Sequence, residues 1–263
     1  MSIEGFLLRT ERLRQGKEQK EVCAGICAIS TLSKLENAHH KAHPDLLKQL
    51  YLALGISYCD DEEVLAPYRK LIEEYFSKWE EWLHHGLGER ILKRANLLRY
   101  SPLAIDFLLI EALEEKEEAL ALLEACQEHL SPREKGIFLF SKALTAYDKD
   151  PDERISIAKE ASQLLGNSIA QSAYCGMLFF VGEYRKLLDE AEKGMQLALK
   201  EGNLYSLARI SALKGSTYAS FDMIALMLSE YKRALKFLSW GPWDAEKGSI
   251  YYNLGATYLS LGE

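Results

Sequence analysis

Apolar residues recur three and four positions apart along almost the whole sequence, and this spacing constrains the fold more than any other feature. One such series is Ile72, Tyr75, Phe76, Trp79, Trp82 and Leu83. No alternation of apolar and polar residues persists beyond a few positions, and the 263 residues include only six prolines. The sequence therefore predicts an all-α protein built from helices of about 12–20 residues.

Short polar, glycine or proline positions mark the predicted helix ends. A serine or aspartate precedes proline at Ser101-Pro102, Ser131-Pro132 and Asp150-Pro151, which is typical of a helix N-terminus. Further breaks are expected at Gly166-Asn167 and Gly202-Asn203. Because the connections are short, the sequence favours an array of helical hairpins.

The C-terminal third repeats itself at a period of 40 residues, which places KGSTY (214–218) on LGATY (254–258). The stretch YYNLGATYLSLGE (251–263) places a tyrosine and a second glycine after its first glycine. This spacing resembles the first helix of a tetratricopeptide (TPR) repeat, although a tyrosine near a glycine also occurs in ordinary helix packing. The resemblance implies a right-handed superhelix of TPR-like hairpins, whose concave face would hold an extended peptide or a partner helix.

Three repeats are expected to begin near residues 168, 208 and 248, after two degenerate hairpins at about 101–130 and 132–165. The chain stops at Glu263, where the second helix of the last repeat is expected to begin. This predicts an array that is cut short at its C-terminus.

Composition excludes several classes of protein. The 48% apolar content is too high for a disordered chain, and no apolar stretch approaches the roughly 20 residues of a membrane span. The first residues lack the basic and apolar blocks of a secretory signal. The five cysteines are scattered and odd in number, which suits reduced thiols in a cytoplasmic protein.

Residues 1–57, here called the head, carry a second pattern. Five helices are expected, over 3–15, 18–26, 29–37 and 44–55, with the last of these stretches divided in two. The run LRTERLRQGKEQKEVCAGICAISTLSKLEN resembles the helix-turn-helix of lambda and 434 repressors (the XRE group), with an arginine-rich first helix and a glutamine opening the second. The resemblance implies a five-helix bundle that binds DNA.

The third helix of the head has two different faces. Leu32 and Leu35, together with Val22 and Ile26 of the preceding segment, form the apolar face that would lock it in place. The opposite face would then point toward a major groove. The resemblance implies DNA contacts from Gln19, Ile29, Ser30, Thr31, Ser33, Lys34, Asn37, His40 and Lys41. It also implies a structural ion pair between Arg12 and Glu36, while Ser30 and Ser33 alternatively form a solvated surface.

Charge is divided unevenly between the head and the rest of the chain. The head holds eight Lys and Arg against six Asp and Glu, whereas the remainder holds 24 against 33. A mildly basic head on an acidic body suits a head that meets phosphates and a body that meets another partner.

The step of 17 residues from Gln19 to Glu36 is shorter than in many XRE proteins. Together with Ile-Cys in the turn, it resembles the peptide-pheromone-sensing regulators of Firmicutes, the Rgg, NprR, PlcR and PrgX (RRNPP) group, which carry TPR-type repeats behind the same head. This resemblance implies a homodimer on double-stranded DNA with an inverted-repeat operator, and a short intracellular oligopeptide on the concave repeat face.

Polar residues on the inner helices are the candidates for a peptide site, because a bound peptide presents backbone amides. In the 40-residue register these are Ser172, Arg209, Ser216, Ser249, Tyr252 and Asn253. Asn253 would pair with a peptide-bond amide and Arg209 with a ligand carboxylate. The alternative for each residue is a polar concave surface without a ligand.

Other chemistry finds little support. Cys23 and Cys27 with His39 and His43 have spacings that suggest zinc, but four ligands at about 2.0–2.3 Å from one metal would dismantle the helix-turn-helix packing. No glycine-rich phosphate loop or cysteine nucleophile site is found, and the acidic runs fit solvated helix faces. We therefore expect no enzyme, no metal and no cofactor.

The expected domains are a DNA-binding head at 1–57, a linker helix and degenerate hairpin at 58–100, and a TPR-like array at 101–263. A long helix over about 62–84 carries Trp79 and Trp82, which either pack in the core or form a hinge or dimer contact. The predicted function is a cytoplasmic transcription regulator whose array senses a signalling peptide. The alternative is a regulator whose array serves only dimerisation or binding of a protein partner.

Overall fold

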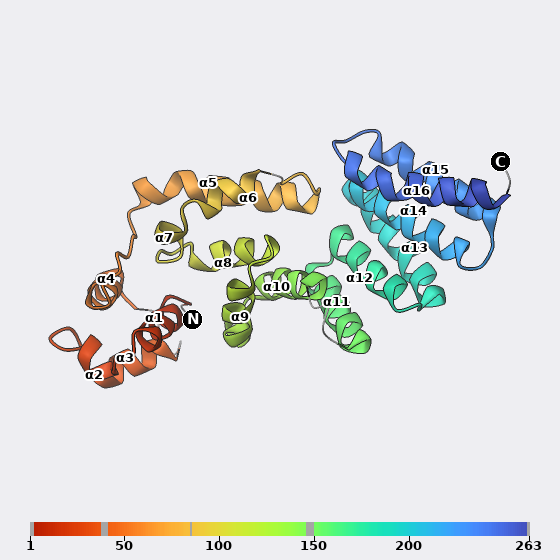
Figure 1. Ribbon diagram of the computed structural model, residues 1–263. Coiled ribbons are helices and arrows are strands. Elements are labelled where there is room, and N and C mark those ends of the chain that lie inside the picture. Colours follow the sequence, from red (N-terminus) through yellow and green to blue (C-terminus); the bar gives the residue numbers. More distant parts are fainter. Residues whose placement is uncertain (1–2, 38–41, 85, 146–149, 262–263) are drawn as a thin grey trace. The chain divides into compact units, whose positions relative to one another are not determined.

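The computed structural model describes residues 3–37, 42–84, 86–145 and 150–261. Over these residues the chain forms sixteen α-helices, one 3-10 helix and no strand, so the all-α prediction is confirmed (Figure 1). The chain divides into two compact units. The first comprises Met1–Phe76 with His85–Phe138, and the second comprises Ser77–His84 with Leu139–Glu263.

The head lies in the first unit and consists of four helices in its described part, where five were expected. They are α1 (Ile3–Arg14), α2 (Gln19–Val22), α3 (Ile29–Glu36) and α4 (Pro44–Ala53). The second helix is shorter than predicted because the backbone turns at once after Val22. Ile26 N–H donates to the Cys23 carbonyl, and Gly25 has a φ of +72°, a conformation that suits glycine.

The core of the head explains why these four segments fold together. Leu8 of α1, Leu32 of α3 and Leu50 of α4 are completely buried, and Tyr51 beside them donates its hydroxyl to the Glu4 carbonyl. Gly5 lets α1 approach α3, since a Cβ at this position would lie 2.1 Å from the Leu35 carbonyl oxygen. Burial of these side chains supplies the main free energy of folding.

The rest of the first unit is helical as well. Its elements are the first part of α5 (Glu62–Glu80), α6 (Leu87–Leu92), α7 (Ala95–Leu98), α8 (Ala104–Leu113), α9 (Glu117–Ala125), the 3-10 helix η1 (Gln127–His129) and the start of α10 (Pro132–Thr145). The head packs on this region, because α1 contacts α8 and the Tyr100 hydroxyl donates to Glu11 at 2.8 Å. Cys59 N–H also donates to the Tyr100 carbonyl at 3.0 Å.

The second unit contains the repeats. Its helices after α10 are α11 (Pro151–Leu165), α12 (Ser168–Phe180), α13 (Tyr184–Glu201), α14 (Leu204–Ala219), α15 (Ile224–Leu238) and α16 (Asp244–Leu261). From α11 onward each helix contacts the next, and α12 also contacts α14, as expected for stacked hairpins. The hairpin α12–α13 starts at the predicted residue 168, whereas α14 and α16 start at 204 and 244.

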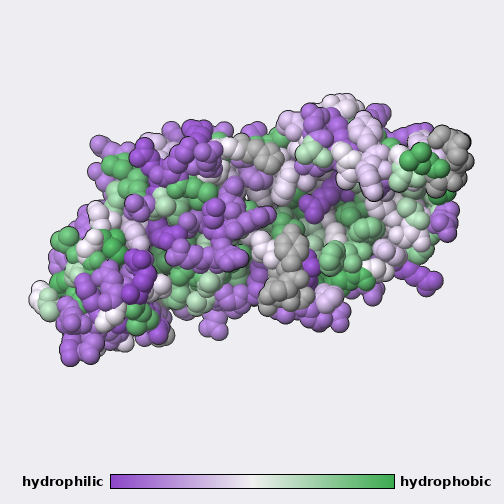
Figure 2. Space-filling model, in the orientation of Figure 1, coloured by the Kyte–Doolittle hydropathy of each residue, from purple (hydrophilic) through white to green (hydrophobic). Residues whose placement is uncertain are grey.

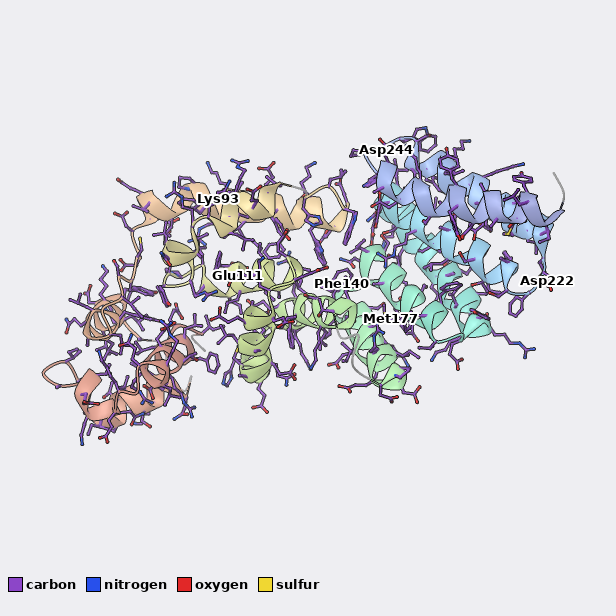
Figure 3. All side chains as sticks on the ribbon, in the orientation of Figure 1. Lys93, Glu111, Phe140, Met177, Asp222 and Asp244 are labelled. Atoms are coloured by element: carbon purple, nitrogen blue, oxygen red, sulfur yellow. The ribbon has the colours of Figure 1, made fainter. Side chains whose placement is uncertain are left out.

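Glycine and aspartate shape the hairpin of α14 and α15. Gly215 lies against the Tyr231 ring of α15, and a Cβ on it would come within 2.7 Å of that ring. Asp222 lies in the turn that joins these two helices and has a φ of +55° (Figure 3). Close approach of the two helices therefore depends on a missing side chain.

The predicted helix over 62–84 ends earlier, since α5 stops at Glu80. Its residues Ser77–Glu80 belong to the second unit, where Trp79 is buried and meets the Phe140 ring of α10 edge-on at 5.1 Å (Figure 3). Trp79 is therefore a packing residue, whereas Trp82 lies beyond the helix in a different conformation.

The surface is largely polar. Hydrophilic residues cover most of the face seen in Figure 2, and apolar residues appear there in separate patches. Over the described residues, no helix combines the length and the apolar character that crossing a membrane requires.

Candidate nucleic-acid interface and ligand pocket

Helix α3 is anchored by its apolar side. Leu32 and Leu35 are buried in the core of the head, where Val22 of α2 and the half-buried Ile26 pack against them. The helix begins after Ala28 and is eight residues long, so this apolar stripe fixes both its position and its rotation.

The opposite side of α3 forms a surface that we call the reading face, made of Ile29, Ser30, Thr31, Ser33 and Lys34. Ile29 is 51% exposed, Ser30, Thr31 and Lys34 are exposed, and Ser33 is half-buried. The face offers hydroxyl groups, one ammonium group and one apolar side chain. Such groups suit the acceptors, donors and thymine methyl groups of a major groove.

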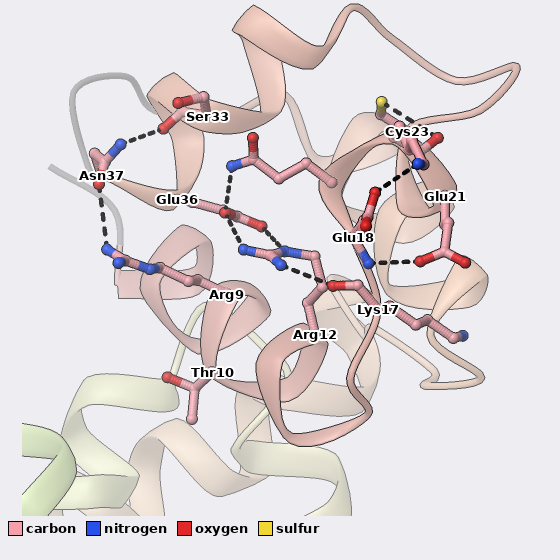
Figure 4. A network of polar contacts seen from close by, with 12 residues as sticks. Arg9, Thr10, Arg12, Lys17, Glu18, Glu21, Cys23, Ser33, Glu36 and Asn37 are labelled. Atoms are coloured by element: carbon pink, nitrogen blue, oxygen red, sulfur yellow. Dashed lines mark hydrogen bonds and ion pairs between the residues drawn. The ribbon is translucent and has the colours of Figure 1, made fainter.

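A buried polar network orients the reading face (Figure 4). Arg12 of α1 donates from Nε and Nη2 to the two carboxylate oxygens of Glu36, at 2.6 and 2.8 Å. Arg12 also donates to the Lys17 carbonyl at 2.8 Å, and the bond with Glu36 raises the pKa of its guanidinium. This pair connects α1 to the last residue of α3, which the resemblance implied.

Two of the remaining candidates belong to the same polar surroundings. Gln19 opens α2 and donates its amide to Glu36 at 2.7 Å, so its side chain supports the ion pair. Asn37 donates to the Ser33 carbonyl at 2.8 Å and accepts from Arg9 at 3.2 Å. His40 and Lys41 lie outside the described residues.

Sequence reasoning missed Arg9. Its guanidinium is exposed and reaches Asn37, directly after the reading face, where a phosphate would lie if α3 entered a groove (Figure 4). A signal was present in the sequence, because Arg9 stands three residues before Arg12 and therefore shares its side of α1.

The pair of cysteines in the head takes part in packing. Cys23 is buried in the core and its thiol contacts the Lys20 carbonyl, while burial raises the pKa of the Cys27 thiol. His43 caps α4 by accepting from the Asp45 amide. These contacts give each side chain a structural role.

The second unit contains a pocket of about 200 Å³, here called the Arg209 pocket. Its lining residues come from α14, the end of α15 and α16, and they are Tyr205, Ala208, Arg209, Ala212, Leu238, Glu246, Ser249 and Ile250. The walls are mainly apolar, and the polar groups are one guanidinium, one carboxylate and two hydroxyls. A small pocket with few convergent polar groups is typical of a ligand site.

Arg209 provides the positive charge of this pocket. It contacts the Tyr205 hydroxyl, and none of the ion pairs found among the described residues involves it. Gly176 of α12 lies beside it, and a Cβ there would be in ordinary van der Waals contact with the guanidinium, at 3.5 Å. Burial raises the pKa of the Tyr205 hydroxyl, and the Arg209 charge opposes that shift. The guanidinium is therefore available to a carboxylate.

The predicted peptide residues fall into separate groups. Arg209 and Ser249 line the pocket together. Ser216 and Asn253 instead meet at the Tyr231 hydroxyl, at 3.0 and 3.1 Å. Tyr252 is 77% exposed and does not line the pocket.

Ser172 lies in a different environment from the other candidates. It is fully buried on α12, and its hydroxyl donates to the Ile169 carbonyl of the same helix. Its side chain therefore belongs to the packing between helices and faces no open surface.

Comparison with known proteins gives a match of fold. No family model and no curated protein matches the sequence. Bacillus thuringiensis PlcR, solved in complex with the peptide PapR7 and DNA, is 14% identical, with a TM-score of 0.57 over 95% of this chain and 99% of PlcR.

The apo form of the competence regulator ComR from Streptococcus vestibularis is 12% identical, with a TM-score of 0.51 over 96% of this chain and 97% of ComR. PlcR is one of the proteins named in the sequence resemblance, so the expected arrangement of head and repeats is confirmed. The chain therefore has the fold of PlcR and of the competence regulator ComR.

Proposed function

We propose that this chain is a sequence-specific DNA-binding transcription regulator, and that its repeats bind a short signalling peptide. One observation carries the proposal: α3 is locked by its buried leucines while the reading face stays exposed. A helix held in this way can enter a major groove without unfolding any part of the head. It would work in the cytoplasm, as a homodimer on an inverted repeat, and without enzymatic activity.

The likeness to PlcR supports the two classes of ligand. That protein was solved with both a peptide and DNA, and the match extends over head and repeats. The same division of labour in this chain agrees with its charge, because the head is mildly basic and the remainder is acidic.

The Arg209 pocket is the proposed site for one end of the peptide. A volume of about 200 Å³ suits one or two residues rather than a whole peptide. Arg209 would bind a carboxylate through two parallel hydrogen bonds. The apolar walls formed by Ala208, Ala212 and Ile250 would contact an apolar side chain of the peptide. The remainder of the peptide would follow the inner helices toward Asn253.

A gel-shift experiment tests both parts of the proposal. The protein is mixed with the DNA upstream of its own gene and with a scrambled duplex, with and without synthetic peptides from neighbouring reading frames. We expect preferential retention of the upstream DNA and a change of affinity with one peptide. No preference for any duplex at low salt would refute DNA recognition.

A pair of arginine variants tests the peptide site. Arg209→Ala should abolish the response to the peptide and leave binding of DNA without peptide unchanged. The matched control is Arg233→Ala on α15, because Arg233 is exposed and pairs with Glu230 of its own helix. If DNA binding is intact and no peptide alters it in the unmodified protein, the array serves dimerisation or a protein partner instead.

A further inference from the structure

At the C-terminal end of α5, a tryptophan adopts a backbone conformation that glycine usually adopts. Leu83 N–H donates to the Lys78 carbonyl at 2.7 Å, and Trp82 N–H donates to the Trp79 carbonyl at 2.9 Å. This pair of bonds is a Schellman closure, which requires a left-handed residue between them. Trp82 occupies that place with a φ of +57°.

Two other helices of the second unit close in the same way with glycine, whereas α14 closes with Asp222 and α8 of the first unit closes with Glu115. Gly182 ends α12 and Gly202 ends α13, with φ values of +81° and +71°. A bulky aromatic residue in this region is a genuine outlier, since its Cβ crowds the backbone. The conformation of Trp82 is therefore maintained by contacts elsewhere in the fold.

Three contacts from the repeats of the same unit hold Trp82 and the end of α5, and the His84 ring also meets Trp82 edge-on at 5.3 Å. Its ring stacks on Tyr205 of α14, with centroids 5.2 Å apart and planes inclined by 11°. Trp243, directly before α16, donates its indole N–H to the Trp82 carbonyl at 3.1 Å. Asn203 donates its amide to the Glu80 carbonyl at 2.7 Å. We call Trp82, Asn203, Tyr205 and Trp243 the Trp82 clasp.

The clasp and the Arg209 pocket share one residue. One face of the Tyr205 ring lies on Trp82, while Tyr205 also lines the pocket and its hydroxyl contacts Arg209. Trp243 is 5.6 Å from Tyr205 between ring centroids, and the helix that follows it supplies Glu246 and Ser249 to the pocket. A ligand that fixes Arg209 would therefore also restrict Tyr205.

We propose that Trp82 and Tyr205 are positioning residues of the ligand site, and that occupation of the Arg209 pocket stabilises the closed end of α5. This inference rests on the proposed function, in which the pocket binds a peptide carboxylate. The coupling is reciprocal, so an intact clasp raises the affinity of the pocket and an occupied pocket tightens the clasp.

Simple packing does not explain the clasp. Trp79 fills the packing role at the end of α5, since it is buried against Phe140. Trp82 is only half-buried and adopts a conformation in which glycine would fit without strain. The main-chain carbonyls of Glu80 and Trp82 also accept hydrogen bonds from Asn203 and Trp243, so more than ring packing ties this closure to the repeats.

The test uses the whole chain and a probe sized to the pocket, N-acetyl-L-leucine, with the neutral N-acetyl-L-leucinamide as its control. Binding is measured by nuclear magnetic resonance, and hydrogen exchange is followed by mass spectrometry over residues 78–84. The carboxylate probe should slow exchange at Trp82 and Leu83, whose amides close α5, by about fivefold. The leucinamide should have no such effect.

Two variants separate positioning from packing. Trp82→Gly fits the left-handed conformation but removes the ring, so it should weaken probe binding about fivefold or more while circular dichroism stays unchanged. Tyr205→Phe keeps the stacked ring but loses the contact with Arg209. Helix α5 should therefore stay closed in this variant, while the probe should no longer slow hydrogen exchange over residues 78–84. Trp240→Ala is the matched control, because Trp240 is 59% exposed and belongs to neither feature.

The outcomes distinguish the inference from the proposed function. If the probe binds the unmodified protein and Trp82→Gly equally well and exchange over 78–84 does not change, the clasp is refuted and the pocket stands. If the probe does not bind the unmodified protein, or the leucinamide binds as tightly, the carboxylate pocket and the clasp are both refuted.

Discussion

Arg12 and Glu36 face each other in the interior of the head and form two parallel hydrogen bonds, at 2.6 and 2.8 Å, between the first helix and the end of α3. Glu36 also receives the amide of Gln19, so residues of α1, α2 and α3 meet at one carboxylate. This junction fixes the rotation of α3, and with it the direction of the reading face. In the proposed function, the direction in which α3 would meet DNA therefore depends on this buried pair.

Removing the positive partner of this pair should destabilise the head strongly. Arg12→Met leaves the Glu36 carboxylate, which is 2% exposed, without its charge partner. We expect the free energy of unfolding to fall by about 3–5 kcal/mol, because an uncompensated buried charge remains. The measurement is a urea titration followed by circular dichroism.

Two further variants control for the loss of the arginine side chain. Arg14→Met breaks the pair between the exposed Arg14 guanidinium and Glu11, whose buried carboxylate keeps the hydrogen bond from the Tyr100 hydroxyl, so it should cost clearly less than Arg12→Met. Arg12→Met combined with Glu36→Leu should recover much of the lost stability, because no buried charge is left. Equal effects of Arg12→Met and Arg14→Met would contradict a structural role for the buried pair.

Lys34 should contribute to the choice of DNA sequence. Its ammonium group is exposed on the reading face, where it can donate to guanine. Lys34→Ala should weaken specific binding by about 1–3 kcal/mol and non-specific binding by less. Fluorescence anisotropy with upstream and scrambled duplexes at one fixed salt concentration measures the ratio of the two affinities.

Lys93→Ala is the matched control, since Lys93 is an exposed lysine directly after α6 that pairs with Glu89 of that helix (Figure 3). It should leave the ratio of affinities unchanged. An unchanged ratio in Lys34→Ala as well would mean that Lys34 meets only phosphates or solvent.

Much of the fold is encoded in short-range sequence signals. Helices α10 and α11 begin at Pro132 and Pro151, as the serine and aspartate before each proline indicated. Helix α12 begins at Ser168, directly after the glycine and asparagine that marked a break, and Asn167 caps it. These features depend on residues a few positions apart, and the sequence displays such residues directly.

The Trp82 clasp beside the pocket depends on contacts that no local pattern contains. Trp243 and Trp82 are 161 positions apart, and the left-handed conformation of Trp82 contradicts its own preference. The register of the repeats also changes, because α12 and α14 start 36 residues apart while α14 and α16 start 40 apart. A uniform period of 40 therefore fails on α12, where Ser172 is buried.

Gly5 should be required for the close packing of α1 on α3. Its missing side chain accommodates the Leu35 backbone, which cannot move as a flexible side chain would. Gly5→Ala should reduce the free energy of unfolding of the head by about 1–3 kcal/mol or more. The exposed Gly248 within α16 is the matched control, since a Cβ there meets open space.

For Gly248→Ala we expect the opposite sign, a gain of about 0.4–1 kcal/mol, because alanine restricts the unfolded chain and favours helix. Thermal unfolding of both variants gives the comparison. If Gly5→Ala is as stable as Gly248→Ala, then α1 and α3 do not approach as closely as described.

Asp106 on α8 should make the stability of the first unit depend on pH. Burial raises the pKa of its carboxyl above the ordinary value of 3.8, and the nearby Glu134 raises it further, while Arg133 and Arg69 oppose the shift. The folded state therefore holds the proton more tightly than the unfolded state. The stabilising contribution of this carboxyl is fully present below pH 3.8 and is lost as the pH rises through the raised pKa.

Asp106→Asn has no carboxyl to titrate. The free energy of unfolding of this variant, relative to that of the unmodified protein, should therefore increase between about pH 4 and pH 7 in urea titrations. A difference that stays constant over this range would contradict a buried carboxyl with a raised pKa.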